Sequence, residues 1–269
     1  MTVADLHLHS TASDGLLTPS QTIQRAAELR IGIVALTDHD TTEGIPEAMA
    51  AGRELAVRVV TGVEISTELD GEEVHILGYK FNPDFPGLQN MLTKLKQARA
   101  KRILDITDRL ANLGFDITRK EVLAASGNTS SIGRPHIARV MVAKGFAGSV
   151  GEVFERWIGP GCPAFVKRYK LTPTDAIEII RSAGGLAFLA HAGLLNRGLT
   201  VADCLLSQGL DGIEVFHTEH SQEQVEGFLQ YVRERDIYLS GGSDCHGNPR
   251  HMLMGSVRVD AQLVEPWLI

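Results

Sequence analysis

Residues 31–40 read IGIVALTDHD. The nearly continuous apolar run over residues 31–37 is typical of a strand that is covered on both faces, as in a parallel sheet. Asp38, His39 and Asp40 follow at once, where this strand should end. The stretch therefore predicts a buried α/β sheet with polar side chains gathered at the carboxyl end of a strand.

Strands and helices alternate on both sides of this stretch. The predicted strands lie at residues 3–9, 31–37, 57–65, 73–79, 186–191, 209–217 and 237–246, and the pattern allows a short one at 257–259. Predicted helices lie at about residues 18–29, 46–55, 174–183 and 222–235. Such repetition predicts parallel pairing in an α/β layer or barrel, and about seven strands are enough to close a barrel.

The middle of the chain is different, because no strand pattern interrupts it. Helices are predicted at residues 88–113, from 118, from 135 and at 150–157. A connection of roughly 75 residues is far longer than an ordinary loop, so we expect an all-helical insertion. We expect residues 91–165 to form this insertion, as a substrate-binding cap, and residues 1–90 and 166–269 to form the barrel.

Charge is distributed unevenly along the chain. The formal net charge is −7, which argues against a protein that binds nucleic acid over its whole surface. Residues 91–170 nevertheless carry 15 basic and 6 acidic side chains, a balance of +9. This segment is either an ordinary solvated face or the positive wall of a site for an anionic substrate.

Other features of the sequence concern the compartment. No apolar run approaches the ~20 residues of a membrane span, and the first residues lack the basic and apolar regions of a signal peptide. The three cysteines, Cys162, Cys204 and Cys245, lack the spacing of a redox or zinc motif. We expect a cytoplasmic protein with no membrane partner and no affinity for long duplex nucleic acid.

Histidine and carboxylate side chains recur at the predicted strand ends. They are His7, His9, Asp14, His39, Glu64, His75, His191, Asp244 and His246. A single histidine is more often structural than a ligand, and a single aspartate can cap a turn. Three carboxylates gathered in one buried place would repel one another, whereas divalent cations would neutralise them. Metal binding is therefore the favoured interpretation.

The type and number of these side chains indicate the metal. Imidazole nitrogens and carboxylate oxygens suit manganese, zinc or iron and disfavour calcium. Nine ligands are too many for one zinc ion and suit three divalent ions with a bridging carboxylate. We expect manganese, with zinc or iron as alternatives. Cys245 lies between Asp244 and His246, so its side chain should face the other way.

These residues stand in motifs that resemble a known superfamily. The motifs are DLHLHS at 5–10 with DG at 14–15, TDHD at 37–40, GVEIS at 62–66, HILG at 75–78, AH at 190–191 and SDCH at 243–246. They resemble the PHP (polymerase and histidinol phosphatase) superfamily from the first strand to the last. The resemblance implies a distorted (β/α)7 TIM-like barrel of PHP type with a trinuclear metal centre.

The resemblance also implies how ligands would be shared. His7, His9, Glu64 and Asp244 would hold one ion, and Glu64 would bridge to a second ion held by His75 and His191. Asp14, His39 and His246 would hold the third ion. The better-known pattern has a histidine where this chain has Asp14, which makes that position a harder ligand.

The helical insertion and residues 133–136 (GRPH) resemble a subgroup of this superfamily. That subgroup contains nucleoside 3′,5′-bisphosphate phosphatases and exonucleases that degrade short RNA from the 5′ end. Arg134 precedes Pro135, a favoured first residue of a helix, so we expect it at a helix N-terminus, where anions bind. Lys167 and Arg168 are weaker candidates for substrate contacts. His217 ends a predicted strand, and three roles are open for it: a structural one, a contact to the reacting phosphate, or protonation of the leaving oxygen.

The predicted activity is hydrolysis of the 3′-phosphate of a nucleoside 3′,5′-bisphosphate by a metal-activated hydroxide. A small phosphorylated nucleotide is the expected partner, and Arg134 and His217 are the expected catalytic side chains outside the metal set. Exonuclease action on short RNA and a histidinol-phosphate-type phosphatase are the alternatives. A C–N amidohydrolase and an inactive polymerase module fit the motifs less well.

Overall fold

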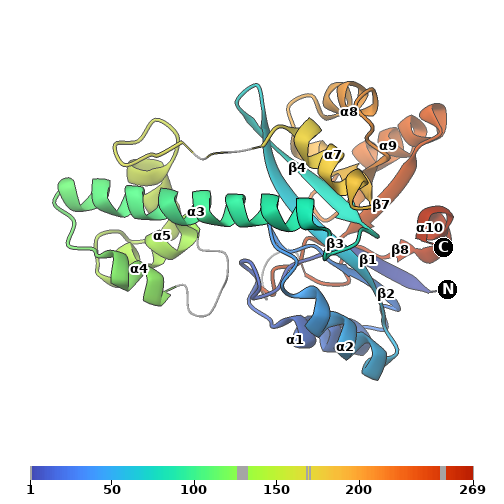
Figure 1. Cartoon of the computed structure of the whole chain (residues 1–269), viewed down its shortest axis with the longest axis horizontal. Helices are drawn as coiled ribbons and strands as arrows, with labels where there is room; N and C mark the ends of the chain where they lie inside the picture. The colour runs from blue at the N-terminus through green and yellow to red at the C-terminus, as the bar shows by residue number, and fades with distance from the viewer. Residues whose placement is uncertain (1, 126–132, 168, 170, 249–252, 269) are drawn as a thin grey trace. The chain divides into compact units, whose positions relative to one another are not determined.

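The computed structural model describes residues 2–125, 133–167, 169, 171–248 and 253–268. The chain divides into two compact units, one formed by residues 1–91 and 170–269 and the other by residues 92–169. The first unit contains the strands (Figure 1). The second is helical throughout its described part.

The strands of the first unit form one mixed sheet. Among the described residues these are β1 (Val3–Leu8), β2 (Ile33–Leu36), β3 (Arg58–Leu69), β4 (Glu72–Tyr79), β5 (Leu186–Leu189), β6 (Gly212–His217), β7 (Tyr238–Gly242) and β8 (Val259–Asp260). Their order is β7-β6-β5-β4-β3-β2-β1-β8. The α/β class and the seven predicted strands are confirmed.

The sheet closes almost completely into a barrel, because the chain after β7 returns to β1. The backbone N–H of Asp244 donates to the carbonyl of His7 at 2.9 Å, and that of His9 donates to the carbonyl of Cys245 at 3.0 Å. Gly242 permits this approach, since a Cβ atom there would lie 2.4 Å from the Cβ of His7. Closure of the barrel thus brings residues 244–246 against His7 and His9.

The expectation of parallel pairing is wrong for two strands, β4 and the short β8, which runs antiparallel to β1. β4 runs antiparallel to both β3 and β5. Asp70 and Gly71, with φ angles of 50° and 88°, form the two-residue turn between β3 and β4. An Asp-Gly pair with positive φ at both positions makes a tight hairpin and leaves no length for a crossover helix.

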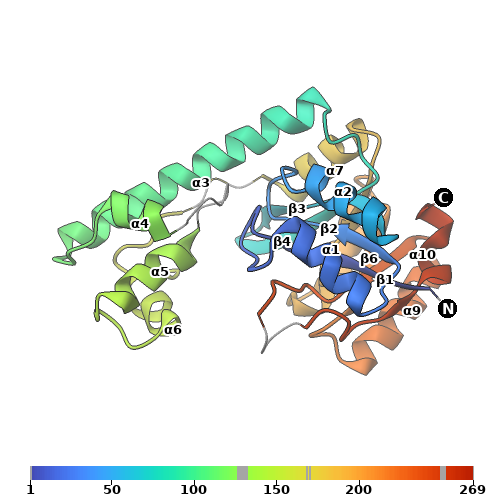
Figure 2. The ribbon, with the colours of Figure 1, turned by 90° about the horizontal axis from the view of Figure 1, so that it is seen from below.

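Helices cover the outside of the barrel. They are α1 (Pro19–Glu28), α2 (Ile45–Leu55), α7 (Pro173–Ser182), α8 (Gly198–Leu206), α9 (Gln222–Arg235) and α10 (Ala261–Leu268). Helices α1 and α2 lie beside β1 and β2 in Figure 2 and pack Ile23, Ala26 and Ala48 against Leu8 and Val34. The sequence prediction omitted α8 and α10.

Aromatic side chains fill one end of the barrel interior. Tyr79 stacks on Trp267 of α10 at 5.1 Å and meets Phe188 edge-on at 5.2 Å. The indole N–H of Trp267 donates to the carbonyl of Leu239, and the Tyr79 hydroxyl donates to that of Leu6. This packing leaves the opposite strand ends for polar side chains.

The second unit has its own apolar core. Its helices are α4 (Arg119–Ala125), α5 (Arg134–Ala143), α6 (Val150–Val153) and a π-helical turn (Phe154–Ile158), together with most of α3 (Pro86–Asn112). Buried Ile106, Leu110, Ile137 and Met141 form the centre of this core. The predicted helices of this segment are confirmed.

Candidate metal centre

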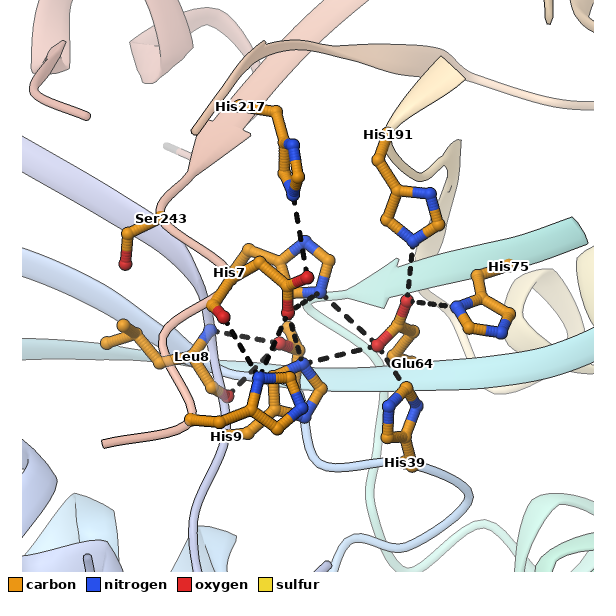
Figure 3. Close-up of polar contacts among 12 residues, drawn as sticks. His7, Leu8, His9, His39, Glu64, His75, His191, His217 and Ser243 are labelled. Carbon is orange, nitrogen blue, oxygen red and sulfur yellow. Dashed lines mark hydrogen bonds and ion pairs between the residues drawn. The ribbon is translucent and has the colours of Figure 1, made fainter. Parts of the chain in front are cut away.

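All nine predicted metal ligands belong to the barrel unit, and five of the histidines surround one carboxylate, that of Glu64 (Figure 3). Its Oε2 atom lies 3.3 Å from Nε2 of both His7 and His9 and 3.0 Å from Nδ1 of His39. Its Oε1 atom lies 2.7 Å from Nδ1 of His75 and 3.2 Å from Nε2 of His191. One buried carboxylate therefore faces five imidazoles.

Strand geometry explains how β1 contributes to this centre. Successive side chains of a strand alternate between its faces, so Asp5 and His7 point the same way, and His9 continues this row just past the strand. All three are buried. Nε2 of His9 also lies 3.0 Å from Oδ1 of Asp244, which follows β7. Barrel closure therefore unites ligands that are more than 230 positions apart in the sequence.

His75 reaches the centre in a way that the sequence analysis did not foresee. It lies near the start of β4, and not at a carboxyl end. Because β4 is antiparallel to β3, its beginning lies at the same end of the barrel as the ends of the neighbouring strands, and His75 pairs with Ser66. The reversal of β4 is therefore what places His75 next to Glu64.

Eight of the nine residues fall into three overlapping groups, and the donor atoms within each group lie within 4.8 Å of one another. The groups are His9, Asp14, His39 and His246; then His7, His9, Glu64 and Asp244; then His39, Glu64 and His75. His191 touches Glu64 without belonging to a group. Each pair of groups shares one residue, which is His9, Glu64 or His39.

Several donor atoms of the centre have no hydrogen-bond partner. In the part of the chain that the structure describes, all but two of the buried side-chain nitrogen and oxygen atoms without such a partner belong here, the exceptions being Nε2 of His217 and Oγ of Ser240. They include both ring nitrogens of His9, Nε2 of His7, Oε2 of Glu64 and Oδ1 of Asp244. Buried polar atoms are costly when unpaired, so these residues fit divalent cations as their missing partners.

The charges in the metal-free centre perturb the pKa values of its groups. Burial lowers the pKa of His9, but the nearby carboxylates of Asp244 and Glu64 outweigh burial and raise it to about 10. Burial likewise lowers and Glu64 raises the pKa of His75, to about 9. For Glu64, burial alone would raise the pKa, yet His39, His75 and His7 hold it well below its usual range. The carboxylates of this centre therefore favour the protonated, positively charged forms of His9 and His75.

Two buried carboxylates outside the predicted set hold the loops that carry the ligands. Asp38 accepts hydrogen bonds from the backbone and the hydroxyl of Ser10, both at 2.7 Å, and from the hydroxyl of Ser13 at 2.6 Å. Asp5 accepts from the backbone and the hydroxyl of Ser243 at 2.8 and 2.7 Å. These contacts fix the residues that immediately precede Asp14 and Asp244.

A third such carboxylate is Glu214 on β6, which is fully buried. Its Oε1 atom lies 3.0 Å from Nδ1 of His7, and its Oε2 atom accepts from the backbone N–H of His191 at 2.7 Å. The sequence analysis missed Glu214. An acidic residue within the apolar strand GIEVFH, three positions before His217, is the signal that could have found it.

The backbone is strained at two of the predicted ligands. His191 has φ of 30° and Asp244 has φ of 54°. Non-glycine residues seldom adopt this left-handed region, and such conformations gather at functional sites. Cys245 instead packs in the apolar cluster with Leu8.

The remaining predicted site residues are dispersed. His217 is buried on β6, with Nε2 3.5 Å from Oδ2 of Asp244. Arg134 begins α5 of the helical unit, where its guanidinium lies 5.1 Å from the centre of the Phe154 ring. Lys167 belongs to the same unit and is exposed. Arg168 lies outside the described residues.

Comparison with known proteins identifies the same family that the sequence motifs resemble. The PHP domain family matches residues 5–145. The chain is 36% identical over 246 residues to a 5′-3′ exoribonuclease of Haemophilus influenzae, which covers 90% of this chain and 89% of that protein. It is 34% identical to a 3′,5′-nucleoside bisphosphate phosphatase of Chromobacterium violaceum, covering 90% and 86%.

A solved structure is similar over nearly the whole chain. A protein from Bifidobacterium adolescentis described as a metal-dependent phosphoesterase superposes with a TM-score of 0.87 at 31% identity. The match covers 98% of this chain and 95% of that one. None of the described helices is long and apolar enough to span a membrane.

Proposed function

The chain belongs to the PHP domain family of metal-dependent phosphoesterases, and we propose that it removes the 3′-phosphate from nucleoside 3′,5′-bisphosphates. The family resemblance in the motifs is thereby confirmed, while the substrate is our proposal. The observation that carries the chemistry is Glu64, a buried carboxylate within 3.3 Å of five histidine side chains.

We propose that the nine residues hold three divalent ions, manganese in the first place. Glu64 offers both oxygens and is the natural bridge between ions, whereas Asp14 and His246 are the most exposed members of the set. When bound, such cations acidify water and neutralise the charge that develops on a phosphoryl group. The strained backbone at His191 and Asp244 holds their side chains toward this centre.

His217 is proposed to give a proton to the leaving oxygen. Its Nε2 atom, the donor in this role, lies 3.5 Å from Oδ2 of Asp244. Burial lowers the pKa of His217, but Asp244 and Glu214 raise it above its usual value. A group that keeps its proton near neutral pH is suited to act as a general acid.

The second phosphate of the substrate is assigned to the helical segment 91–165 and the residues that follow it. Arg134 stands at the start of α5, where backbone N–H groups favour anions, and its packing on Phe154 restricts its rotamers. Lys167 and Arg168 are among the basic side chains that give residues 91–170 a charge balance of +9. In this proposal the 5′-phosphate is a recognition handle, and its binding energy orients the 3′-phosphate.

A second activity is favoured by the relative from Haemophilus influenzae, whose name is 5′-3′ exoribonuclease. The terminal nucleotide of a short 5′-phosphorylated RNA carries the same pair of phosphates as a nucleoside 3′,5′-bisphosphate, with the 3′-phosphate esterified to the next nucleotide. The same recognition site could therefore serve both substrates. Both activities break the bond between phosphorus and the 3′-oxygen of the terminal nucleotide, and they differ only in whether that phosphorus also carries the rest of an RNA chain.

The test is a product analysis with the Mn-loaded protein. Its substrates are a nucleoside 3′,5′-bisphosphate, the 3′- and 5′-monophosphates, histidinol phosphate and a short 5′-phosphorylated RNA. We expect the bisphosphate to be cleaved fastest, giving phosphate and the nucleoside 5′-monophosphate. Faster release of mononucleotides from RNA would favour the exonuclease, and cleavage of histidinol phosphate alone would overturn the proposal.

A further inference from the structure

Three buried residues of the barrel, His7, Glu64 and Glu214, form a closed ring of contacts with the partly buried His191. Glu214 meets Nδ1 of His7 at 3.0 Å, and Nε2 of His7 lies 3.3 Å from Glu64. Glu64 in turn lies 3.2 Å from Nε2 of His191, whose backbone N–H donates back to Glu214 at 2.7 Å. The carboxylates of Glu214 and Glu64 thus contact the same two histidines.

The chemistry of the first contact fixes the tautomer of His7. An ionised carboxylate only accepts hydrogen bonds, so Nδ1 of His7 must carry the proton that it shares with Glu214. The neutral ring then presents its Nε2 lone pair to Glu64 and Asp244, 3.3 and 3.4 Å away. This is the orientation in which a histidine can serve as a metal ligand.

The second contact fixes the backbone that carries His191. This residue holds the left-handed φ of 30°, which a histidine seldom adopts unaided. The backbone N–H of His191 donates a hydrogen bond to Oε2 of Glu214, and the N–H of the preceding Ala190 donates to the carbonyl of His75. These two bonds hold the turn in which the His191 ring points at Glu64.

We propose that Glu214 is the positioning residue that prepares His7 and His191 together for metal binding. The inference rests on the proposed metal site but is independent of the proposed substrate. Glu214 reaches no reacting atom, and it acts through the His7 tautomer and the His191 turn. Because the two histidines contact different oxygens of Glu64, one side chain on β6 prepares both sides of the bridging carboxylate.

Glu214→Gln is the discriminating substitution, because the amide keeps the size of the side chain but offers only one accepting oxygen. If that oxygen faces His191, the amide N–H₂ faces Nδ1 of His7 and drives the proton to Nε2, where it blocks the lone pair. If the amide oxygen faces His7, the amide N–H₂ faces the backbone N–H of His191, and the two donors repel each other. Either arrangement should weaken metal binding by about 10- to 100-fold, as loss of a carboxylate behind a histidine ligand does.

The experiment measures Zn²⁺ and Mn²⁺ affinity by competition with a chelator and reads the histidine tautomers in the Zn-loaded protein from ¹⁵N chemical shifts. In the wild type we expect one imidazole with a protonated Nδ1 and a metal-bound Nε2, assigned by its loss in His7→Gln. In Glu214→Gln we expect that signal to shift and the affinity to fall. Glu226→Gln, an exposed change of the same kind on α9, should alter neither.

The outcomes separate this inference from the proposed function. A wild-type protein that binds no metal would contradict the proposed function itself. A wild type that binds metal, with Glu214→Gln binding equally well or keeping the His7 tautomer, would overturn the role of Glu214. If Glu214→Gln does not fold, the shorter carboxylate of Glu214→Asp replaces it: about tenfold weaker binding supports the inference, and unchanged binding overturns it.

Discussion

Nδ1 of His75 lies 2.7 Å from Oε1 of Glu64, although the two residues come from strands that run in opposite directions. The Asp70-Gly71 turn reverses the chain between them and brings the start of β4 to the strand ends where the other ligands gather. The centre therefore depends on the hairpin of β3 and β4, where the parallel pattern of the sheet is broken.

The first prediction concerns Glu64→Gln. This carboxylate faces five histidines, so its loss should weaken the binding of more than one metal ion. Removing an outer partner of a metal ligand costs about 10- to 100-fold, and a direct bridge should cost more than 100-fold in phosphate release. Elemental analysis should find three Mn ions per wild-type chain and fewer in the variant.

Glu68→Gln is the matched control for this change. It lies on the same strand, four residues further along, and belongs to none of the three groups. It should keep wild-type metal content and turnover. A Glu64→Gln protein with three ions and full activity would remove Glu64 from the centre, and a wild type with a single ion would exclude the trinuclear arrangement.

The second prediction is that metal binding releases protons. In the metal-free centre the carboxylates overcome burial and raise the pKa of His9 to about 10 and of His75 to about 9. At pH 8 both rings are therefore mostly protonated, yet a ligand nitrogen must be deprotonated. Metal affinity should rise as pH increases toward 10 and fall as pH decreases.

The same two histidines should influence the stability of the metal-free protein. Their pKa values are higher in the folded than in the unfolded chain, so they contribute stability that is complete below pH 6.5 and is lost as pH rises through 9 and 10.

Calorimetric titration of the protein with metal, in buffers of different ionisation enthalpy, measures the protons released on metal binding. Metal binding at pH 8 with no proton release would contradict the second prediction.

The third prediction concerns His217→Gln. If Nε2 of His217 protonates the leaving oxygen, the substitution should lower kcat for a nucleoside bisphosphate by about 10²- to 10⁴-fold. The loss should nearly disappear with p-nitrophenyl phosphate, because p-nitrophenolate leaves without a proton. Equal losses on both substrates would instead assign His217 to orienting Asp244, its neighbour at 3.5 Å.

The fourth prediction concerns Arg134→Ala. A charged hydrogen bond to phosphate contributes about 1.5–3 kcal/mol, so kcat/KM for the bisphosphate should fall about 10- to 100-fold. Arg139→Ala, an exposed position on the same helix, should leave the rate unchanged. If Arg134→Ala slowed p-nitrophenyl phosphate hydrolysis equally, Arg134 would not serve the second phosphate.

Local patterns in the sequence were sufficient to predict the barrel class and all nine clustered side chains. His39 and His191 follow the ends of β2 and β5 and converge at one side of the barrel, where they meet Glu64, although Glu64 lies within β3 and not at its end as predicted. The direction of β4 was not foreseen, although Asp70-Gly71 is a hairpin signal. The role of Glu214 could not be predicted, because a lone acidic residue in a strand does not reveal which distant histidine it contacts.

The position of the cleaved bond tests the central claim most directly. The Mn-loaded protein is incubated with adenosine 3′,5′-bisphosphate, and the nucleotide product is identified by chromatography against the 3′- and 5′-monophosphates. The account predicts phosphate and the 5′-monophosphate, at a rate well above that for a 3′-monophosphate, which lacks the handle. Formation of the 3′-monophosphate, or equal rates for the bisphosphate and the 3′-monophosphate, would contradict it.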